Sequence, residues 1–302
     1  MILRLAVAAL ATLLATSPLR AEPPRVVTDI PPVAALVADV AGSRLTPFLI
    51  LEGPVDPHHA QLRPSAARAL AAADLVVWIG PELTPWLARA LDALAPEARR
   101  LTLLDAPGTI TRAPLFAEED DHAHEDEHPH ATRDPHAWLD PENAASWLDA
   151  IAEALAALDP EAAERYRANA RTARQRIARA GELARSRLEP VRAIPLIVQH
   201  DAWAHFADRF GLHVAASLAD SEATAPGARR FAELRALTSR HGQVCLVGEA
   251  PAASPAMRRL AADTSAPLVV ADPLGLALSG GPGDYERLIL ALAEALAGCA
   301  AR

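Results

Sequence analysis

One short tract of this chain concentrates side chains that bind metals. Between Glu118 and His130 stand seven acidic residues and four histidines, His122, His124, His128 and His130. Imidazole suits zinc, copper and nickel, and carboxylates attract a cation, so the tract indicates metal handling. Few apolar side chains are present to offset the entropy lost on ordering, so residues 117–133 are expected to form a solvated loop. A charged loop that only keeps the protein soluble is the alternative.

Four more candidate ligands stand singly, each in a short motif. They are His58 in Asp56-Pro57-His58-His59, His136 in Asp134-Pro135-His136, His200 after the apolar run Leu196–Gln199, and Asp272 after the run Leu268–Ala271. Ligands of open α/β sheets bind beyond the carboxyl ends of the strands, where such residues would gather. Three histidines and an aspartate could form a four-coordinate zinc site, with zinc to nitrogen distances of about 2.0–2.1 Å. The adjacent prolines, Pro57, Pro135 and Pro273, would reduce the ordering entropy of binding.

Further polar and aromatic residues are expected to support these ligands. Those that could orient a ligand or respond to metal occupancy are His59, His205 and Glu249. Two tryptophans next to the candidate ligands, Trp138 and Trp203, are expected to pack the cleft and exclude water, with stacking on an aromatic substrate as the alternative. The two remaining histidines, His213 and His241, are interpreted as ordinary core or surface residues.

The elements that must position these residues alternate along the chain. Short apolar runs predict strands at Arg25–Thr28, Leu45–Leu51, Leu75–Ile79, Leu101–Leu104, Leu196–Gln199, Val244–Gly248 and Leu268–Ala271, with a further apolar stretch at His213–Ala216. Segments with helical periodicity lie between them, at Val33–Ala41, Ser65–Ala73, Pro85–Leu94, Ala202–Phe210, Ala228–Ser239, Ala256–Thr264 and Tyr285–Ala297. This alternation predicts an α/β fold with mostly parallel sheets flanked by helices.

A segment without that alternation lies between the two halves. Glu161–Leu188 has no proline and carries apolar residues at helical spacing, after an Asp159-Pro160 start typical of a helix N-terminus. Such a helix spans about 40 Å, which is more than one lobe needs. We therefore expect two Rossmann-like α/β lobes joined by one long rigid helix; a long helix lying on one domain is the alternative. The expected boundaries are 22–141 for the first lobe, 142–190 for the helical segment and 191–302 for the second lobe.

The N-terminus and the net charge indicate where the protein works and which partners it can have. Arg4 precedes an apolar run from Leu5 to Ala15, so residues 1–21 are interpreted as a cleavable secretory signal peptide, with an uncleaved anchor as the alternative. The net charge of -9 and the lack of a basic stripe exclude nucleic acid as a partner. In an oxidising compartment the two cysteines, Cys245 and Cys299, can pair; two buried free thiols are the alternative.

The chain resembles the zinc-binding, ZnuA-like solute-binding proteins that serve ABC importers. The resemblance is carried by VVTDIPPVAALVADVAG near the N-terminus and then, in order, by PHHAQLRPS, DPHAWLDP, HDAWAHFADRFGL, GEAPAASP and DPLG. It implies metal ligands at His58, His136 and His200, with Asp272 at the place of the fourth ligand that several members use. It also implies the disulfide between Cys245 and Cys299, two lobes joined by a rigid helix, and an acidic His-rich loop before DPH.

The function that this resemblance implies is capture of Zn2+ in the periplasm and delivery to the membrane permease of an ABC zinc importer, without catalysis. Zinc would be the transported ligand, the protein a monomer, and periplasmic metallochaperones further partners. Related manganese binders commonly carry a carboxylate at the position of His200, so this imidazole favours zinc over the harder manganese. The alternatives are a binding protein for manganese or another divalent metal, a zinc hydrolase, and a passive buffer that binds metal through Glu118–His130 alone.

Overall fold

Two parallel sheets form the frame of the molecule. The computed structural model describes residues 22–116, 133–219 and 227–301. The predicted signal peptide and the histidines of the acidic tract therefore lie outside the described residues. In each sheet the four strands are all parallel, and in each the first strand in sequence lies between the second and the third. This repeated order confirms the predicted fold class, two α/β lobes of the same topology.

The first sheet has the order β2-β1-β3-β4. Its strands are β1 (Val26–Thr28), β2 (Phe48–Leu49), β3 (Leu75–Trp78) and β4 (Arg99–Thr102), and its helices are α1 (Pro31–Ala41), α2 (Pro64–Ala71) and α3 (Pro85–Leu94). The predicted strand Leu45–Leu51 is too long, because only two of its residues pair with β1. The prediction for the fourth strand is displaced by two residues. Leu103 and Leu104 are buried in a 3-10 helix and not in the strand. Arg99 and Arg100 belong to the edge strand β4 and pair with β3, and solvent accommodates their charge there.

The second sheet has the order β6-β5-β7-β8. Its strands are β5 (Leu196–His200), β6 (Val214–Ala219), β7 (Cys245–Glu249) and β8 (Leu268–Ala271), and its helices are α6 (Ala204–Phe210), α7 (Ala228–His241), α8 (Pro255–Thr264) and α9 (Asp284–Ala297). Two strands end on residues singled out from the sequence, β5 on His200 and β7 on Glu249. Because β5 and β7 are neighbours in a parallel sheet, these two ends lie at the same edge.

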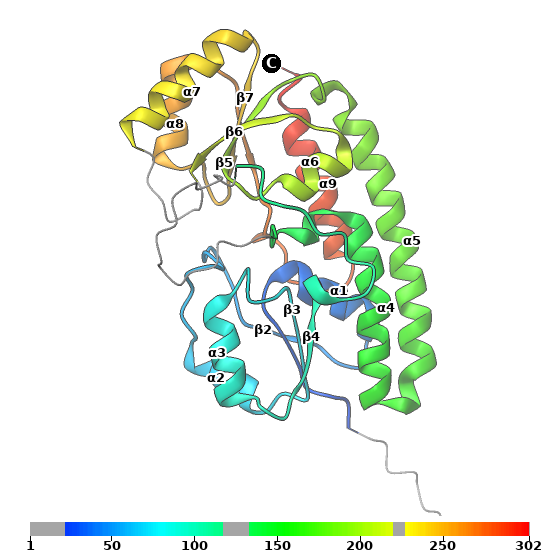
Figure 1. Ribbon diagram of the computed structural model, residues 1–302. Helices are drawn as coiled ribbons and strands as arrows, with labels where there is room; N and C mark the ends of the chain where they lie inside the picture. Colours follow the sequence, from blue (N-terminus) through cyan, green and yellow to red (C-terminus); the bar gives the residue numbers. More distant parts are fainter. Residues whose placement is uncertain (1–21, 117–132, 220–226, 302) are drawn as a thin grey trace, which may run out of the picture.

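A long helix joins the lobes. Helix α5 (Ala163–Leu188) has 26 residues and follows α4 (Pro141–Leu158), and it runs along one side of the molecule past both sheets (Figure 1). Its buried residues recur at helical spacing, as in Tyr166, Ala170, Ala173 and Ile177. It begins two residues later than predicted because Pro160–Ala162 form a 3-10 turn. The predicted strut between two lobes is confirmed, since α5 spans about 39 Å at 1.5 Å per residue.

The core is continuous between the two lobes. One hydrophobic cluster includes residues of both sheets, among them Val76 and Val198, and every residue of α1 is buried. The indole Nε1–H of Trp138 donates to the carbonyl of Pro273 at 2.8 Å, and the Tyr285 hydroxyl donates to the carbonyl of Trp138 at 2.7 Å. These bonds tie the segment that carries His136 to the second lobe. The lobes are therefore fixed against each other by buried contacts as well as by α5.

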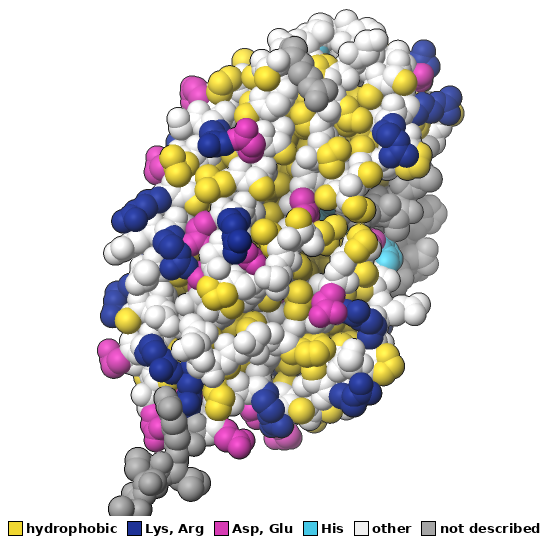
Figure 2. Space-filling model, turned by 180° about the vertical axis from the view of Figure 1, so that it is seen from behind, with side chains coloured by type: hydrophobic (Ala, Val, Ile, Leu, Met, Phe, Trp, Pro, Cys, Tyr) yellow, Lys and Arg dark blue, Asp and Glu magenta, His cyan; other side chains and the backbone are white. Residues whose placement is uncertain are grey.

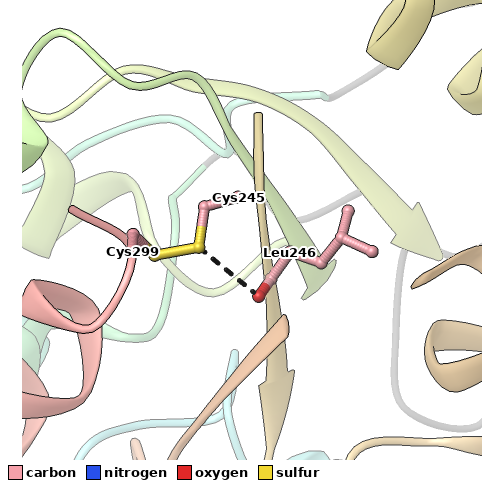
Figure 3. The surroundings of a disulfide bond; sticks show 3 residues. All are labelled: Cys245, Leu246 and Cys299. Carbon is pink, nitrogen blue, oxygen red and sulfur yellow. Dashed lines mark hydrogen bonds between the residues drawn. A yellow bond between two sulfur atoms is a disulfide. The ribbon is translucent and has the colours of Figure 1, made fainter. Parts of the chain in front are cut away.

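A disulfide closes the C-terminal part of the chain. Cys245, the first residue of β7, is bonded to Cys299 after α9, with a Cα–Cα distance of 5.7 Å (Figure 3). The predicted pairing is confirmed, and within the described residues no free cysteine is present. The bond joins α9, which packs beside α5, to the central part of the second sheet.

The surface carries charges of both signs. On the face shown in Figure 2, basic and acidic side chains are interspersed among apolar ones, and no stripe of a single sign is present there. Among the described residues, no helix combines the length and the apolar character needed to cross a membrane.

Candidate metal centre

Three histidines from distant parts of the chain meet between the two sheets. The ring of His136 lies 5.5 Å from that of His58 and 5.3 Å from that of His200, measured between ring centroids. His58 belongs to the turn between β2 and α2, His136 precedes the short 3-10 helix Ala137–Leu139, and His200 ends β5. Imidazoles bound to one tetrahedral zinc at about 2.0–2.1 Å would have ring centroids about 5 Å apart. The distances of the His136 ring from the rings of His58 and His200 thus each fit a pair of imidazoles that share a metal ion.

Buried carboxylates fix the orientation of two of these rings. Asp134 Oδ1 lies 2.6 Å from Nδ1 of His136 and also accepts a hydrogen bond from the His136 backbone N–H. Glu249 Oε2 lies 2.7 Å from Nδ1 of His200, and both side chains of this pair are at most 6% exposed. A carboxylate at Nδ1 selects the tautomer that carries the proton there, which leaves the lone pair of Nε2 for a metal.

The charge state of the cluster is set by burial and by these pairs. Burial alone would raise the pKa of Asp134, but the neighbouring His136 outweighs it, so the pKa of this carboxyl is lowered. Burial lowers the pKa of His58 to about 4, and the electrostatic interaction with His136 adds to the effect. At neutral pH the ring of His58 is therefore neutral, which is the form that binds a metal.

Asp272 lies at the same edge of the second sheet as His200 and Glu249. It follows β8 directly, and in the pairing of β7 with β8 Glu249 lies opposite Ala271. One oxygen, Oδ2, accepts a hydrogen bond from the backbone N–H of Ala277 at 3.3 Å. The other, Oδ1, is buried and has no hydrogen-bond partner among the described residues. A buried carboxylate oxygen without a donor is costly unless a cation or a water occupies its lone pairs.

The side chains gather without forming a closed shell. Within residues 22–116, 133–219 and 227–301, no group of three or more His, Cys, Asp or Glu side chains is arranged as a ready coordination site. The ring centroid of His136 nonetheless lies at a suitable distance from those of His58 and His200.

The other residues singled out from the sequence divide into two groups. Near the cluster, His205 is fully buried and its Nε2 lies 3.2 Å from the carbonyl oxygen of Asp134, while burial lowers its pKa. Trp138 packs 5.2 Å from the ring of His136, and Trp203 is 1% exposed, so both contribute packing rather than an open stacking surface. Away from the cluster, His213 and His241 are exposed and lie 6.5 Å from each other.

Three aspartates with a role at this site were not singled out from the sequence. Asp134 orients His136 as described above, and Asp56 holds the turn of His58 by accepting the backbone N–H of His58 at 2.8 Å. Asp201, next to His200, accepts the backbone N–H groups of Leu115 and Phe116 at 3.3 and 2.9 Å. The Asp-x-His spacing of the first two is a signal that could have identified them, because an aspartate often accepts the N–H two residues on. Asp201 has no such signal, since its partners are 85 and 86 residues away.

Two parallel α/β lobes, a rigid helix between them and a cluster of imidazoles at their junction define a class of protein, the metal-specific solute-binding proteins. The family model described as zinc-uptake complex component A, periplasmic (ZnuA), matches residues 26–299. The high-affinity zinc uptake system protein ZnuA of Paracoccus denitrificans (strain Pd 1222) is 40% identical over 310 residues, covering 94% of each chain. The chain belongs to the ZnuA family.

Solved structures agree on the fold. A crystal structure of ZnuA superposes with a TM-score of 0.77 at 22% identity and covers 92% of this chain and 99% of that one. The solute-binding protein FpvC of Pseudomonas aeruginosa, in complex with Mn2+, superposes with a TM-score of 0.76 at 17% identity, covering 92% and 98%. Membership of the family confirms the predicted class, a zinc-binding component of an ABC uptake system that is not an enzyme. The fold is shared with a manganese-bound protein, so the fold alone does not select the metal.

Proposed function

We propose that His58, His136, His200 and Asp272 bind one Zn2+ between the lobes and that the protein delivers this ion to the permease of an ABC zinc importer. Zinc is the cargo here and not a resident cofactor. Three imidazoles and one carboxylate replace the water molecules of the ion, with Nε2 of His136 and His200 as donors. Because the donor set is rich in imidazole, it favours zinc over manganese.

The observation that carries this proposal is the convergence of three imidazole rings, two of them oriented by buried carboxylates. Rings 5.5 and 5.3 Å apart, on segments separated by about 64 to 78 residues, serve no evident packing purpose that apolar side chains would not serve better. The buried Oδ1 of Asp272 adds an acceptor without a donor among the described residues. A divalent cation would satisfy all of these groups at once.

Charge balance supports the same assignment. The ion brings two positive charges into a region where His136 and His200 are 6% exposed. Asp134 and Glu249 place negative charge directly behind two of the ligands, and Asp272 supplies a third carboxylate. Carboxylates that support histidine ligands raise the basicity of the imidazoles and strengthen metal binding.

The cellular setting of this proposal follows from the N-terminus. Residues 1–21 act as a signal peptide that is removed after Ala21, and the mature protein works in the periplasm. The two lobes, 22–141 and 191–302, hold the ion between them, and the segment 142–190 keeps them in register. The partner is the membrane permease, and periplasmic metallochaperones are further candidates for supplying zinc.

The acidic tract has an auxiliary role in this proposal. His122, His124, His128 and His130 provide weak metal binding outside the described residues. Its attachment points favour such a role, because Asp201 holds Leu115 and Phe116 next to His200, and Arg133 directly precedes Asp134, which contacts the ring of His136. The tract therefore leaves and rejoins the structure close to the histidine cluster.

A calorimetric titration of zinc into chelator-stripped mature protein tests the proposal. Replacing any one of His58, His136 and His200 by alanine should reduce affinity by more than the roughly 10–100-fold that loss of a supporting partner costs. His241→Ala, an exposed histidine away from the cluster, is the matched control and should leave affinity unchanged. Absence of a tight site in the unaltered protein would refute the proposal.

Two further experiments test the preference for zinc and the role of the acidic tract. Competition with Mn2+ should leave zinc bound, because imidazole donors favour the softer ion. Deletion of Glu118–His130 should keep the tight site and remove only weaker binding. Loss of the tight site in this deletion would instead show that the tract itself holds the metal.

A further inference from the structure

We propose that His59, oriented by Asp56, forms an outer zinc-binding site that receives the incoming hydrated ion before it passes to His58 and the tight site. This inference rests on the proposed function. The argument begins with a third carboxylate–imidazole pair beside the two already described. Asp56 Oδ2 lies 2.9 Å from Nδ1 of His59, compared with 2.6 Å for the Asp134–His136 pair and 2.7 Å for the Glu249–His200 pair.

The pairing at His59 selects the same tautomer as at the two buried ligands. With its Nδ1 proton directed at Asp56, the ring of His59 has the lone pair of Nε2 available for a metal. Side chains held in this way resemble preorganised ligands, since their rotation is already restricted before the ion arrives. An exposed histidine that had no function would lose rotamer freedom in such a pair for little gain, because exposed ion pairs contribute about 0–1 kcal/mol.

Two related motifs differ in where the aspartate points. In Asp134-Pro135-His136, Oδ1 of the aspartate serves both the backbone N–H and the ring of the same histidine. In Asp56-Pro57-His58-His59, Oδ1 accepts the backbone N–H of His58, but Oδ2 is directed to the ring of His59. The first motif thus prepares one inner ligand. The second positions the turn of His58 and prepares the ring of the residue that follows it.

Exposure separates His59 from the inner ligands. Its side chain is 61% exposed, whereas those of His136 and His200 are each 6% exposed. A hydrated cation cannot reach buried imidazoles before it has shed water, so the first protein ligand to replace a water must face solvent. His59 satisfies this condition, and the carboxylate of Asp56 beside it, 19% exposed, attracts the ion.

The four imidazoles form a series from the surface to the interior. Ring centroids are 6.4 Å apart between His59 and His58, 5.5 Å between His58 and His136, and 5.3 Å between His136 and His200. In this proposal the ion moves along the series by exchanging one imidazole for the next. The backbone carbonyl of Pro57 accepts the Nε1–H of Trp86 at 2.8 Å, which anchors the turn at the start of this series.

A site that zinc occupies only on its way to the tight site affects the rates of binding and release but not the equilibrium affinity. Because His59 is absent from the final ligand shell, its removal should slow binding and release by the same factor and leave the equilibrium Kd unchanged. Association rates among variants of one site span about 1–3 decades, and a change of about tenfold in both rates is expected for His59→Ala. A ligand of the tight site would behave differently, since its loss speeds release and raises Kd.

Stopped-flow measurements on the mature protein, with zinc supplied and withdrawn by a chromophoric chelator, test this. His59→Ala and His59→Gln are compared with His213→Ala, an exposed histidine outside the series, and Kd is measured separately by competition. Slower binding and slower release with unchanged Kd support the outer site. Unchanged rates overturn it, and so does faster release with a raised Kd, which would make His59 a ligand of the tight site. Tight binding by the unaltered protein is established first, so failure of the proposed function is recognised independently.

Discussion

Asp39 lies at a junction of three helices and gives a prediction whose size follows from the structure. Asp39 is on α1 and forms an ion pair with Arg176 of α5. Arg176 also forms an ion pair with Glu286 of α9 at 2.6 Å. The backbone N–H of Gly283 donates to Asp39 Oδ1 at 3.1 Å. Burial raises the pKa of Asp39 to about 6, and the charge of Glu286 adds to this increase, while Arg176 opposes it.

The raised pKa means that this carboxylate opposes folding at neutral pH. Between its usual pKa of 3.8 and the folded value of about 6, the folded protein binds more protons than the unfolded chain, so stability falls as pH rises. The difference of about two pKa units corresponds to about 3 kcal/mol, at about 1.4 kcal/mol per unit. The side chain of Asp39 is 2% exposed, so solvent screens this effect little.

Asp39→Asn removes the titration while it keeps most of the contacts. The amide oxygen can still accept from Gly283 and Arg176, and the oxygen replaced by NH2, Oδ2, has no hydrogen-bond partner among the described residues. Any cost of burying this amide is the same at every pH. The stability of the variant relative to the parent protein should therefore rise by about 3 kcal/mol between about pH 4 and about pH 7.

Urea unfolding at a series of pH values measures this difference. The experiments contain a chelator, because bound zinc would stabilise the folded state by mass action. Asp74→Asn is the matched control with the opposite sign: hydrogen bonds from Arg25 lower the pKa of Asp74, so this variant should lose stability relative to the parent as pH rises. A stability difference for Asp39→Asn that stays constant from about pH 4 to about pH 7 would refute the raised pKa.

Two further predictions concern the second lobe. Replacing Cys245 and Cys299 together by serine should lower the free energy of unfolding by about 2–5 kcal/mol in urea, with zinc affinity unchanged because Cys245 begins β7 and Glu249 ends it; weakened zinc binding would contradict this separation. Glu249→Gln keeps the shape of the side chain but removes the charge behind His200, so zinc affinity should fall about 10–100-fold in a competition titration. An unchanged affinity would show that the charge of Glu249 has no part in binding.

Much of the fold could be predicted from the sequence because its patterns are local. Apolar runs such as Leu75–Ile79 and Leu268–Ala271 are bounded by polar or helix-breaking residues, and they are strands in the structure almost to the residue. The predicted strand length was wrong where it depends on hydrogen-bonded pairing with a neighbouring strand. Leu45–Leu51 is apolar enough for a long strand, but only Phe48 and Leu49 find partners on β1. Burial alone did not distinguish a strand from a buried loop.

The candidate metal centre could also be predicted only in part. The histidines could be found because each stands in a short motif after a predicted strand or in a proline turn. The carboxylates that orient them were harder to find, because pairs such as His200 with Glu249 depend on two strands being neighbours. Asp201 shows the limit most clearly, since it binds backbone groups of Leu115 and Phe116 from across the molecule. Every residue type except proline carries a backbone N–H group, so the residue types in the sequence do not reveal such hydrogen bonds.

The three proposed imidazole ligands are anchored unequally, and this bears on how zinc can leave. His200 ends the central strand β5. His136 lies in a segment that is hydrogen-bonded to the second lobe through Trp138. A buried carboxylate contacts each of these two rings. His58 lies in a turn between β2 and α2, outside any helix or strand. The continuous core and the strut α5 oppose separation of the lobes. Movement of the His58 turn disturbs the fewest buried contacts, so this is the ligand whose displacement costs least, and it is the one adjacent to His59.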